Sequence, residues 1–279
     1  MLELVAAPTN SSANGDRVVA VVDRVTLGYG ANVVVRDASF TVERGRLTAL
    51  IGPNGAGKTT LLHALAGLVA PRSGAVHVRS SLAYVLQVVA QNEALPVTVR
   101  EVVTMGRYAD RGLWGRLRAS DREAVQEAMD RLDVADLAQE HVRDLSVGQR
   151  QRVLVAQGLA QQAEVLLVDE PLSGLDLPSR QRILEVLAAE EAEGRAVVLT
   201  THDLGEAASA DRVVLVGGGV VVAGLPEEVL TAGRLETAYA GRIVRLDGVA
   251  SLLDDSAHHH TAAHVHPSAH VHPSARRRK

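Results

Sequence analysis

The sequence predicts an α/β fold in which helices cover both faces of a parallel sheet. Short apolar runs at 165–168, 196–200 and 212–216 are separated by polar segments long enough to form helices. Strands that are buried on both faces and joined by crossover helices produce this pattern. A further apolar run at 47–51 leads into a glycine-rich loop and then into leucines at helical spacing. This order predicts a strand, a loop and a helix in succession.

Upstream of this unit, two β-branched runs at 18–22 and 33–42 predict strands. Turn-forming residues lie between them, namely Gly28, Gly30, Ala31 and Asn32. The helix after the glycine-rich loop is predicted from the spacing of Leu61, Leu62, Leu65 and Leu68. The stretch at about 88–162 is rich in Arg, Asp, Ala and Leu and has helical periodicity with few strand signals. It therefore predicts a helical subdomain.

The two ends of the chain differ from the part between them. Residues 1–16 have no basic segment before a hydrophobic stretch, so we expect an N-terminal extension and not a signal peptide. Near the C-terminus the apolar pattern stops, and seven of the eleven histidines fall at 258–272. We expect the folded unit to span 17–250, and 251–279 to form a His-rich, disordered tail.

Composition narrows the possible classes of function. The 279 residues are 47% apolar and include no cysteine, which excludes a disulfide framework, a thiolate metal site and a cysteine nucleophile. With 29 basic and 33 acidic residues the net charge is −4, and a nucleic-acid partner is disfavoured because phosphate contacts need a basic surface. The longest uncharged apolar run, at 213–225, is interrupted by three consecutive glycines and is far shorter than the roughly 20 residues of a membrane helix.

Residues 52–59 fit the phosphate-binding pattern GxxxxGK[ST]. Glycines in this pattern let backbone N–H groups surround phosphate oxygens, and the following helix presents the positive end of its dipole. Lys58 is expected to neutralise β- and γ-phosphate charge, and Thr59 to place its hydroxyl on Mg²⁺. The alternative, a chance glycine turn before a helix, is disfavoured by the strand and helix on either side. The predicted contacts to the nucleotide are Gly52, Pro53, Asn54, Gly55, Ala56, Gly57, Lys58, Thr59 and Thr60.

The predicted strand at 165–168 ends in two carboxylates, Asp169 and Glu170. Taken alone, an acidic strand end is more often a solvated turn than a site. Downstream of a phosphate loop the balance reverses, because α/β folds bind ligands at the carboxyl ends of parallel strands. Asp169 is then predicted to hold Mg²⁺ through water, and Glu170 to polarise the attacking water as general base.

Four further motifs point to one family. The segment LSVGQRQRV at 145–153 resembles the signature motif of the ATP-binding cassette (ABC) ATPases. Gln87 after AYVL resembles their Q-loop, SGLD at 173–176 their D-loop, and His202 in TTHD their switch histidine. Tyr29 stands where the family stacks an aromatic side chain on adenine. With these motifs in the family's order between about 17 and 245, the chain is identified as a member of this family.

The resemblance implies a P-loop ABC ATPase cassette with an inserted helical subdomain at about 88–162 and an antiparallel β subdomain, and it implies ATP and Mg²⁺ as ligands. Catalysis is expected to involve Glu170, His202 and Gln87. The Mg²⁺ ligands are expected to be Thr59, Gln87 and Asp169. Further contacts to the nucleotide are expected from Tyr29 and from the signature and D-loop residues Ser146, Gly148, Gln149 and Asp176.

The family also implies partners. Its cassettes face each other head to tail, so that each ATP lies between one chain's phosphate loop and the other chain's signature. We therefore expect a homodimer at the cytoplasmic face of the cell membrane, an integral-membrane permease that docks near Gln87 and the helical subdomain, and an extracytoplasmic metal-binding protein in the same system.

One residue departs from the family pattern. Val147 occupies a signature position where the family usually has glycine. Glycine is favoured in a loop that needs positive φ, because it has no Cβ to clash. We therefore expect backbone strain at Val147 and slower hydrolysis than in relatives, with the phosphate contacts of Ser146 and Gly148 retained.

The cargo is predicted from two segments. Residues 100–108, followed by GLW at 112–114, look like the helical subdomain of bacterial zinc and manganese importer cassettes. The lone Trp114 itself is interpreted as a packing or anchoring residue. The tail carries a His-Val-His repeat, with His264, His266, His270 and His272, and closely spaced imidazoles suit Zn²⁺.

We therefore expect import of a divalent metal, with zinc ahead of manganese. The alternatives are haem or iron-chelate import, a soluble ABC ATPase without a transport role, and a metal-binding protein with a vestigial nucleotide site. A solvated tail without a role is the alternative for the histidines.

Overall fold

The computed structural model describes residues 17–86, 96–108, 116–240, 243–246 and 249–252. Its first half contains β1 (Val18–Tyr29), β2 (Asn32–Glu43), β3 (Arg46–Ile51), α1 (Lys58–Leu65), β4 (Ser73–Val78), β5 (Leu82–Val85), α2 (Val99–Met105), α4 (Ala119–Arg131) and the 3-10 turn η1 (Val142–Asp144). Its second half contains α5 (Val147–Ala160), β6 (Val165–Val168), α6 (Leu177–Ala192), β7 (Ala196–Thr201), α7 (Leu204–Ala208), β8 (Arg212–Gly217), β9 (Val220–Gly224), α8 (Pro226–Val229), α9 (Ala232–Ala238), β10 (Ile243–Leu246) and β11 (Val249–Leu252).

The central sheet has the strand order β5-β6-β7-β3-β8-β9. Its first five strands are parallel, and only β9 runs antiparallel, in a hairpin with β8. A second sheet, with the order β2-β1-β4, is antiparallel throughout. The predicted α/β fold with an antiparallel β subdomain is therefore confirmed. Strands β4, β5, β9, β10 and β11 were not predicted from the sequence.

Side chains of the central sheet alternate between two cores, as the period of two in a strand requires. On one face, Leu167, Val198 and Val214 pack with the leucines of α1 and with the antiparallel sheet. On the other face, Val168 and Leu199 pack with the helices that follow in the chain. Helices or the second sheet thus cover both faces of the parallel sheet.

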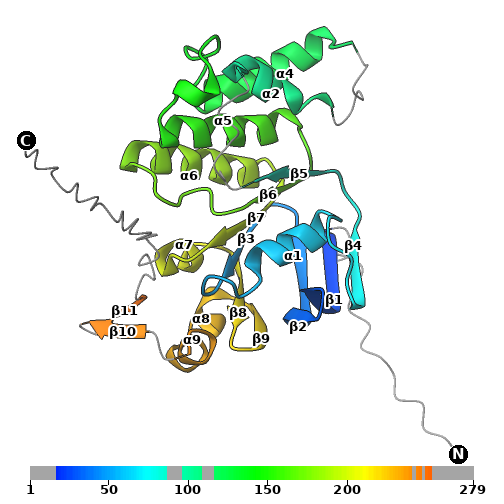
Figure 1. The fold of residues 1–279 in the computed structure, drawn as a ribbon, viewed down its shortest axis with the longest axis vertical. Coiled ribbons are helices and arrows are strands. Elements are labelled where there is room, and N and C mark those ends of the chain that lie inside the picture. The colour runs from blue at the N-terminus through cyan, green and yellow to red at the C-terminus, as the bar shows by residue number, and fades with distance from the viewer. Residues whose placement is uncertain (1–16, 87–95, 109–115, 241–242, 247–248, 253–279) are drawn as a thin grey trace, which may run out of the picture.

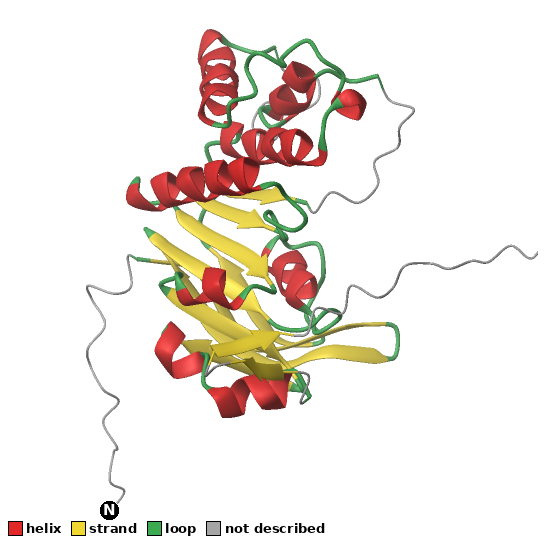
Figure 2. Cartoon of the chain, turned by 90° about the vertical axis from the view of Figure 1, so that its left-hand side faces the viewer, coloured by secondary structure: helices red, strands yellow, loops and turns green. Residues whose placement is uncertain are grey.

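The helical subdomain, α2, α4 and α5, is grouped at one end of the molecule (Figure 1). Helix α6 lies between this group and the central sheet in both views (Figures 1 and 2). An ion-pair cluster ties the subdomain to α6. Glu190 of α6 is 1% exposed and lies 2.6 Å from the guanidinium of Arg131 in α4, and it also pairs with Arg195. Among the described residues, no helix is long and apolar enough to cross a membrane.

Two elements and the end of the folded unit differ by two or more residues from the sequence prediction. β1 continues to Tyr29, well beyond the predicted end at residue 22, because the whole segment pairs with β2 and β4. Helix α1 ends at Leu65, and Leu68, which was predicted to lie on its apolar face, is 64% exposed. β11 runs to Leu252, two residues past the expected domain boundary at 250.

Candidate active site

The glycine-rich loop connects β3 to α1 at the carboxyl end of the central sheet. Gly57 precedes the first residue of α1 with φ 108°, and a Cβ there would lie 2.5 Å from Cγ2 of Val35. A Cβ on Gly52 would lie 1.9 Å from the carbonyl oxygen of Val216 in β8. Packing and backbone conformation therefore both require glycine, and the loop holds its N–H groups at the start of α1, as an anion site needs.

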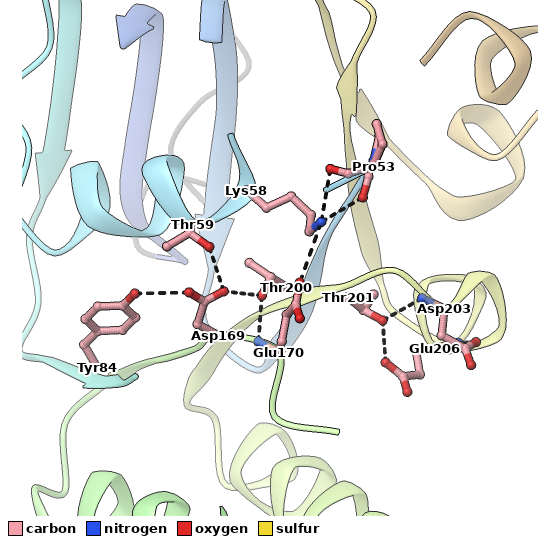
Figure 3. Close-up of polar contacts among 11 residues, drawn as sticks. Pro53, Lys58, Thr59, Tyr84, Asp169, Glu170, Thr200, Thr201, Asp203 and Glu206 are labelled. Carbon is pink, nitrogen blue, oxygen red and sulfur yellow. Dashed lines mark hydrogen bonds and ion pairs between the residues drawn. The ribbon is translucent and has the colours of Figure 1, made fainter. Parts of the chain in front are cut away.

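Lys58 is 4% exposed and is held inside this loop. Its Nζ donates to the carbonyl oxygens of Gly52, at 2.8 Å, and Pro53, at 3.4 Å, and lies 3.8 Å from Oε1 of Glu170 (Figure 3). Burial lowers the pKa of Lys58 below its ordinary value, although the negative charges of Glu170 and Asp169 raise it in part. The loop therefore holds a desolvated cation, which an anionic phosphate would stabilise.

Asp169 is 2% exposed and receives three hydroxyl donors. The hydroxyls of Thr200, at 2.6 Å, and Thr59, at 3.2 Å, donate to its Oδ1, and the phenol of Tyr84 donates to Oδ2 at 3.5 Å (Figure 3). Burial raises the pKa of Tyr84, and the negative charge of Asp169 raises it further, so this phenol stays a donor at neutral pH.

The donors around Asp169 fit Mg²⁺. The carboxylate of Asp169 and the hydroxyl of Thr59 are hard oxygen ligands that face one another at 3.2 Å. In the part of the chain that the structure describes, no group of three or more His, Cys, Asp or Glu side chains could form a dedicated metal cage. Mg²⁺ is commonly bound by one or two protein oxygens together with substrate phosphates, so the two observations agree.

Glu170 lies between two cavities. Its backbone has φ 45°, a left-handed conformation that costs energy for a residue with a Cβ. One cavity, of about 480 Å³, contains the phosphate loop and is lined by Tyr29, Val34, Asn54, Gly55, Gly57, Lys58, Thr59, Thr60 and Glu170. The other, of about 140 Å³, is lined by Glu170, Leu172, Ser173, Gly174, Leu175, Arg180, Thr200, Thr201, His202, Asp203 and Glu206. Tyr29, 52% exposed, and the carboxylate of Glu170 thus border the same space as the phosphate loop.

The loop that carries His202 is tied to the start of α6. Arg180 of α6 lies 3.1 Å from a carboxylate oxygen of Asp203 and 2.8 Å from one of Glu206. Burial raises the pKa of Glu206, whereas backbone N–H donors and Arg180 outweigh burial at Asp203 and lower its pKa. His202 itself is exposed at the wall of the smaller cavity, beside Glu170.

The signature residues lie at the N-terminus of α5. Ser146 caps this helix and forms a reciprocal capping box with Gln149. A Cβ on Gly148 would lie 2.5 Å from Oδ1 of Asp176 and 2.4 Å from Oγ of Ser179, so signature and D-loop are in contact. Neither cavity beside Glu170 is lined by these signature residues or by Asp176, so the described chain does not bring them to its own phosphate loop.

The expected strain at Val147 is wrong. Val147 is the first residue of α5 and is not among the residues with positive φ. The capping box sets the helix start one residue earlier, at Ser146, so Val147 has helical backbone that any residue adopts. Its side chain is 57% exposed.

Several predicted residues lie outside the described residues. These are Gln87, Trp114 and the tail histidines His264, His266, His270 and His272. Conversely, the sequence reasoning missed Thr200 and Tyr84, which both donate to Asp169. The available signal was a hydroxyl within or at the end of two otherwise apolar runs, just before the Q-loop and switch motifs.

Comparisons with known proteins show which proteins this chain is similar to. The family described as ABC transporter matches residues 35–173. Over 250 residues the chain is 35% identical to the chelated iron transport system membrane protein YfeB of Yersinia pestis, covering 85% of this chain and 84% of that protein. It is 34% identical to the manganese transport system ATP-binding protein MntB of Bacillus subtilis, covering 80% and 93%.

A solved structure shows the same fold. The cbiO1 protein of Clostridium perfringens, part of the ABC transporter complex cbiONQ, superposes with a TM-score of 0.66 at 26% identity. The superposition covers 78% of this chain and 92% of that one.

Proposed function

Because the chain belongs to the ABC transporter family as an ATP-binding subunit that hydrolyses ATP, we propose that it energises import of a metal ion or a metal chelate. The observation that carries the catalytic part is the approach of Lys58 and Glu170, 3.8 Å apart, at the wall of the cavity that holds the phosphate loop. The relatives named for chelated iron and for manganese support the cargo class.

In the proposed mechanism the phosphate loop and the N-terminus of α1 bind the phosphates. Lys58 exchanges its carbonyl partners for phosphate oxygens, and Tyr29 stacks on the base. Glu170 accepts a proton from the attacking water, and His202, at the same wall, orients the γ-phosphate. Asp169, Thr59 and Gln87 would hold Mg²⁺, which would supply positive charge to the phosphates when bound. Water is then the nucleophile, and ADP and phosphate are the products.

We propose a head-to-tail homodimer, because Ser146, Gly148 and Gln149 do not line the phosphate-loop cavity of their own chain. A second copy would supply them to the γ-phosphate. The dimer would dock on a separate permease at the cytoplasmic face of the membrane, with an extracytoplasmic binding protein delivering the cargo. Sedimentation of the Glu170→Gln protein with and without Mg-ATP tests the dimer: an ATP-independent monomer would contradict it.

Zinc is the cargo that we propose first, on the strength of the His-Val-His repeat of the tail. Manganese and chelated iron, the cargoes named for the relatives, are the competing candidates. Cells lacking this chain should take up less radiolabelled zinc, and the wild-type chain but not Glu170→Gln should restore uptake. A defect in manganese or iron uptake with normal zinc uptake would contradict zinc and identify the cargo.

The tail is tested separately. We expect residues 256–279 to bind Zn²⁺ weakly, because arranging the imidazoles of a Pro-containing repeat around one ion costs conformational entropy. The bound Zn²⁺ should be released as pH falls through about 6.5 and the imidazoles protonate. Calorimetric titration of Zn²⁺ should show heat for the full chain and none for a chain truncated after residue 255, while both retain ATPase activity. Equal heats from both proteins would remove the tail as support for zinc.

A further inference from the structure

Thr200 links the two carboxylate residues of the site through one hydroxyl. The hydroxyl accepts a hydrogen bond from the backbone N–H of Glu170 at 2.7 Å and donates its single proton to Oδ1 of Asp169 at 2.6 Å. Thr200 is 0% exposed, so both bonds are shielded from bulk solvent. Figure 3 shows the hydroxyl between the two residues.

The sheet explains why this contact forms. β6 and β7 are parallel neighbours, with Val168 opposite Leu199, so Asp169 and Thr200 follow at the same level. Because side chains alternate, Thr200 faces the same side as Ala196 and Val198, toward α1 and the phosphate loop. The next residue, Thr201, faces the other side and donates to Glu206 of α7 at 2.5 Å.

The N–H of Glu170 belongs to a residue held at φ 45°. A left-handed backbone at a non-glycine residue persists only where neighbouring contacts fix it. The hydrogen bond to Thr200 is such a contact, and the direction of the Glu170 side chain toward Lys58 depends on this backbone conformation. The same hydroxyl also sets the orientation of the Asp169 carboxylate, which receives Thr59 on the same oxygen.

We propose that Thr200 is a positioning residue for ATP hydrolysis: its hydroxyl fixes the general base Glu170 and the Mg²⁺-binding carboxylate of Asp169 relative to each other. Thr200 is buried, and its hydroxyl bonds only these two neighbours among the contacts of the described residues. It acts on the chemical step through its two neighbours and leaves the binding of nucleotide to the phosphate loop intact. This inference rests on the roles proposed above for Asp169 and Glu170.

The test uses two pairs of full-length proteins. Wild type is compared with Thr200→Val, in which a methyl group replaces the hydroxyl, and Thr200→Ser is compared with Thr200→Ala, which lacks it. Removing the hydroxyl in either pair should lower kcat about tenfold to a hundredfold, while the KM for Mg-ATP changes by less than about threefold. Thr200→Ser should keep kcat within about threefold of wild type. The second pair carries the test if Thr200→Val does not fold.

A matched control and a second readout separate positioning from folding. Thr48 on β3 is 1% exposed, faces the same side of the sheet next to Val198, and has no hydrogen-bond partner for its hydroxyl among the described residues. Thr48→Val should leave kcat unchanged. Binding of a fluorescent ATP analogue in EDTA, followed by emission, should be the same for wild type, Thr200→Val and Thr48→Val.

The outcomes distinguish this inference from the function on which it rests. Wild-type kcat in Thr200→Val, an equal loss in Thr200→Ser and Thr200→Ala, or a loss of analogue binding in EDTA would each overturn the positioning role. If Glu170→Gln, measured in parallel, lowers turnover while Thr200→Val does not, the catalytic assignment stands and the inference alone fails. If Glu170→Gln hydrolyses ATP at the wild-type rate, the proposed base is wrong.

Discussion

Glu170→Gln should separate nucleotide binding from hydrolysis. The substitution keeps the shape of a side chain that lines the phosphate-loop cavity but removes its capacity to accept a proton. General-base catalysis contributes about 10²- to 10⁴-fold, so turnover should fall by that factor, equivalent to about 3–5 kcal/mol in the barrier. The variant is expected to accumulate in an ATP-bound, closed dimer.

Nucleotide affinity should not fall in this variant. Two unit charges 3.8 Å apart, the separation of Nζ of Lys58 and Oε1 of Glu170, interact by about 4 kcal/mol at an effective dielectric constant of about 20. Without the carboxylate, Lys58 loses this attraction in the free protein, and the incoming γ-phosphate is no longer repelled by a negative charge on residue 170. Both changes favour phosphate binding, so affinity should stay equal or rise.

Two measurements check this prediction: steady-state release of phosphate and titration with a fluorescent ATP analogue. Glu185→Gln is the matched control, because Glu185 carries the same charge on the exposed side of α6, with 52% of its side chain exposed. It should match wild type in both assays. Turnover of Glu170→Gln within about threefold of wild type would refute the assignment of the base.

Three further predictions concern binding and stability. Lys58→Ala should bind ATP weakly at every pH. The affinity of the wild-type protein for ATP should fall as pH rises through the lowered pKa of Lys58, because only the protonated amine attracts phosphate. If titrations of the wild-type protein with ATP in EDTA did not depend on pH, this prediction would be wrong. Val147→Gly should lower the free energy of unfolding in denaturant by about 0.5 kcal/mol, because glycine has more conformational freedom in the unfolded chain and no strain is relieved in the helix. A variant more stable than wild type would contradict this. Glu190→Gln should lower the free energy of unfolding by about 2 kcal/mol. This is less than for a fully buried ion pair, because the side chains of Arg131 and Arg195 are 22% and 25% exposed. An unchanged unfolding midpoint would show that these ion pairs do not stabilise the fold.

The parts of the site that the sequence predicts are those with local requirements. The strand, loop and helix around Lys58 are encoded by consecutive residues. Contacts with β8 and β2 add a tertiary requirement for glycine at residues 52 and 57. Asp169 and Glu170 are recognisable because two carboxylates follow an apolar strand. At these positions the local sequence pattern and the tertiary structure favour the same residue types.

The parts that the sequence did not predict depend on pairing between distant segments. Thr200 becomes a partner of Asp169 only through the register of β6 with β7, across 31 positions of sequence. Val147 was misjudged because a capping box, and not a glycine-dependent loop, starts α5. Leu68 fits the helical spacing of α1, but the helix ends three residues earlier and leaves it exposed.

The end of β7 connects the chemistry to the loop that carries His202. Thr200 faces the phosphate loop and bonds Asp169 and Glu170, whereas Thr201 faces α7 and bonds Glu206 and the N–H of Asp203. Thr200 and Thr201 are consecutive residues of β7, so their side chains face opposite sides of the sheet and bond to different partners. A hydroxyl at each of these two positions is what the arrangement requires, which explains a pair of threonines at the end of an otherwise apolar strand.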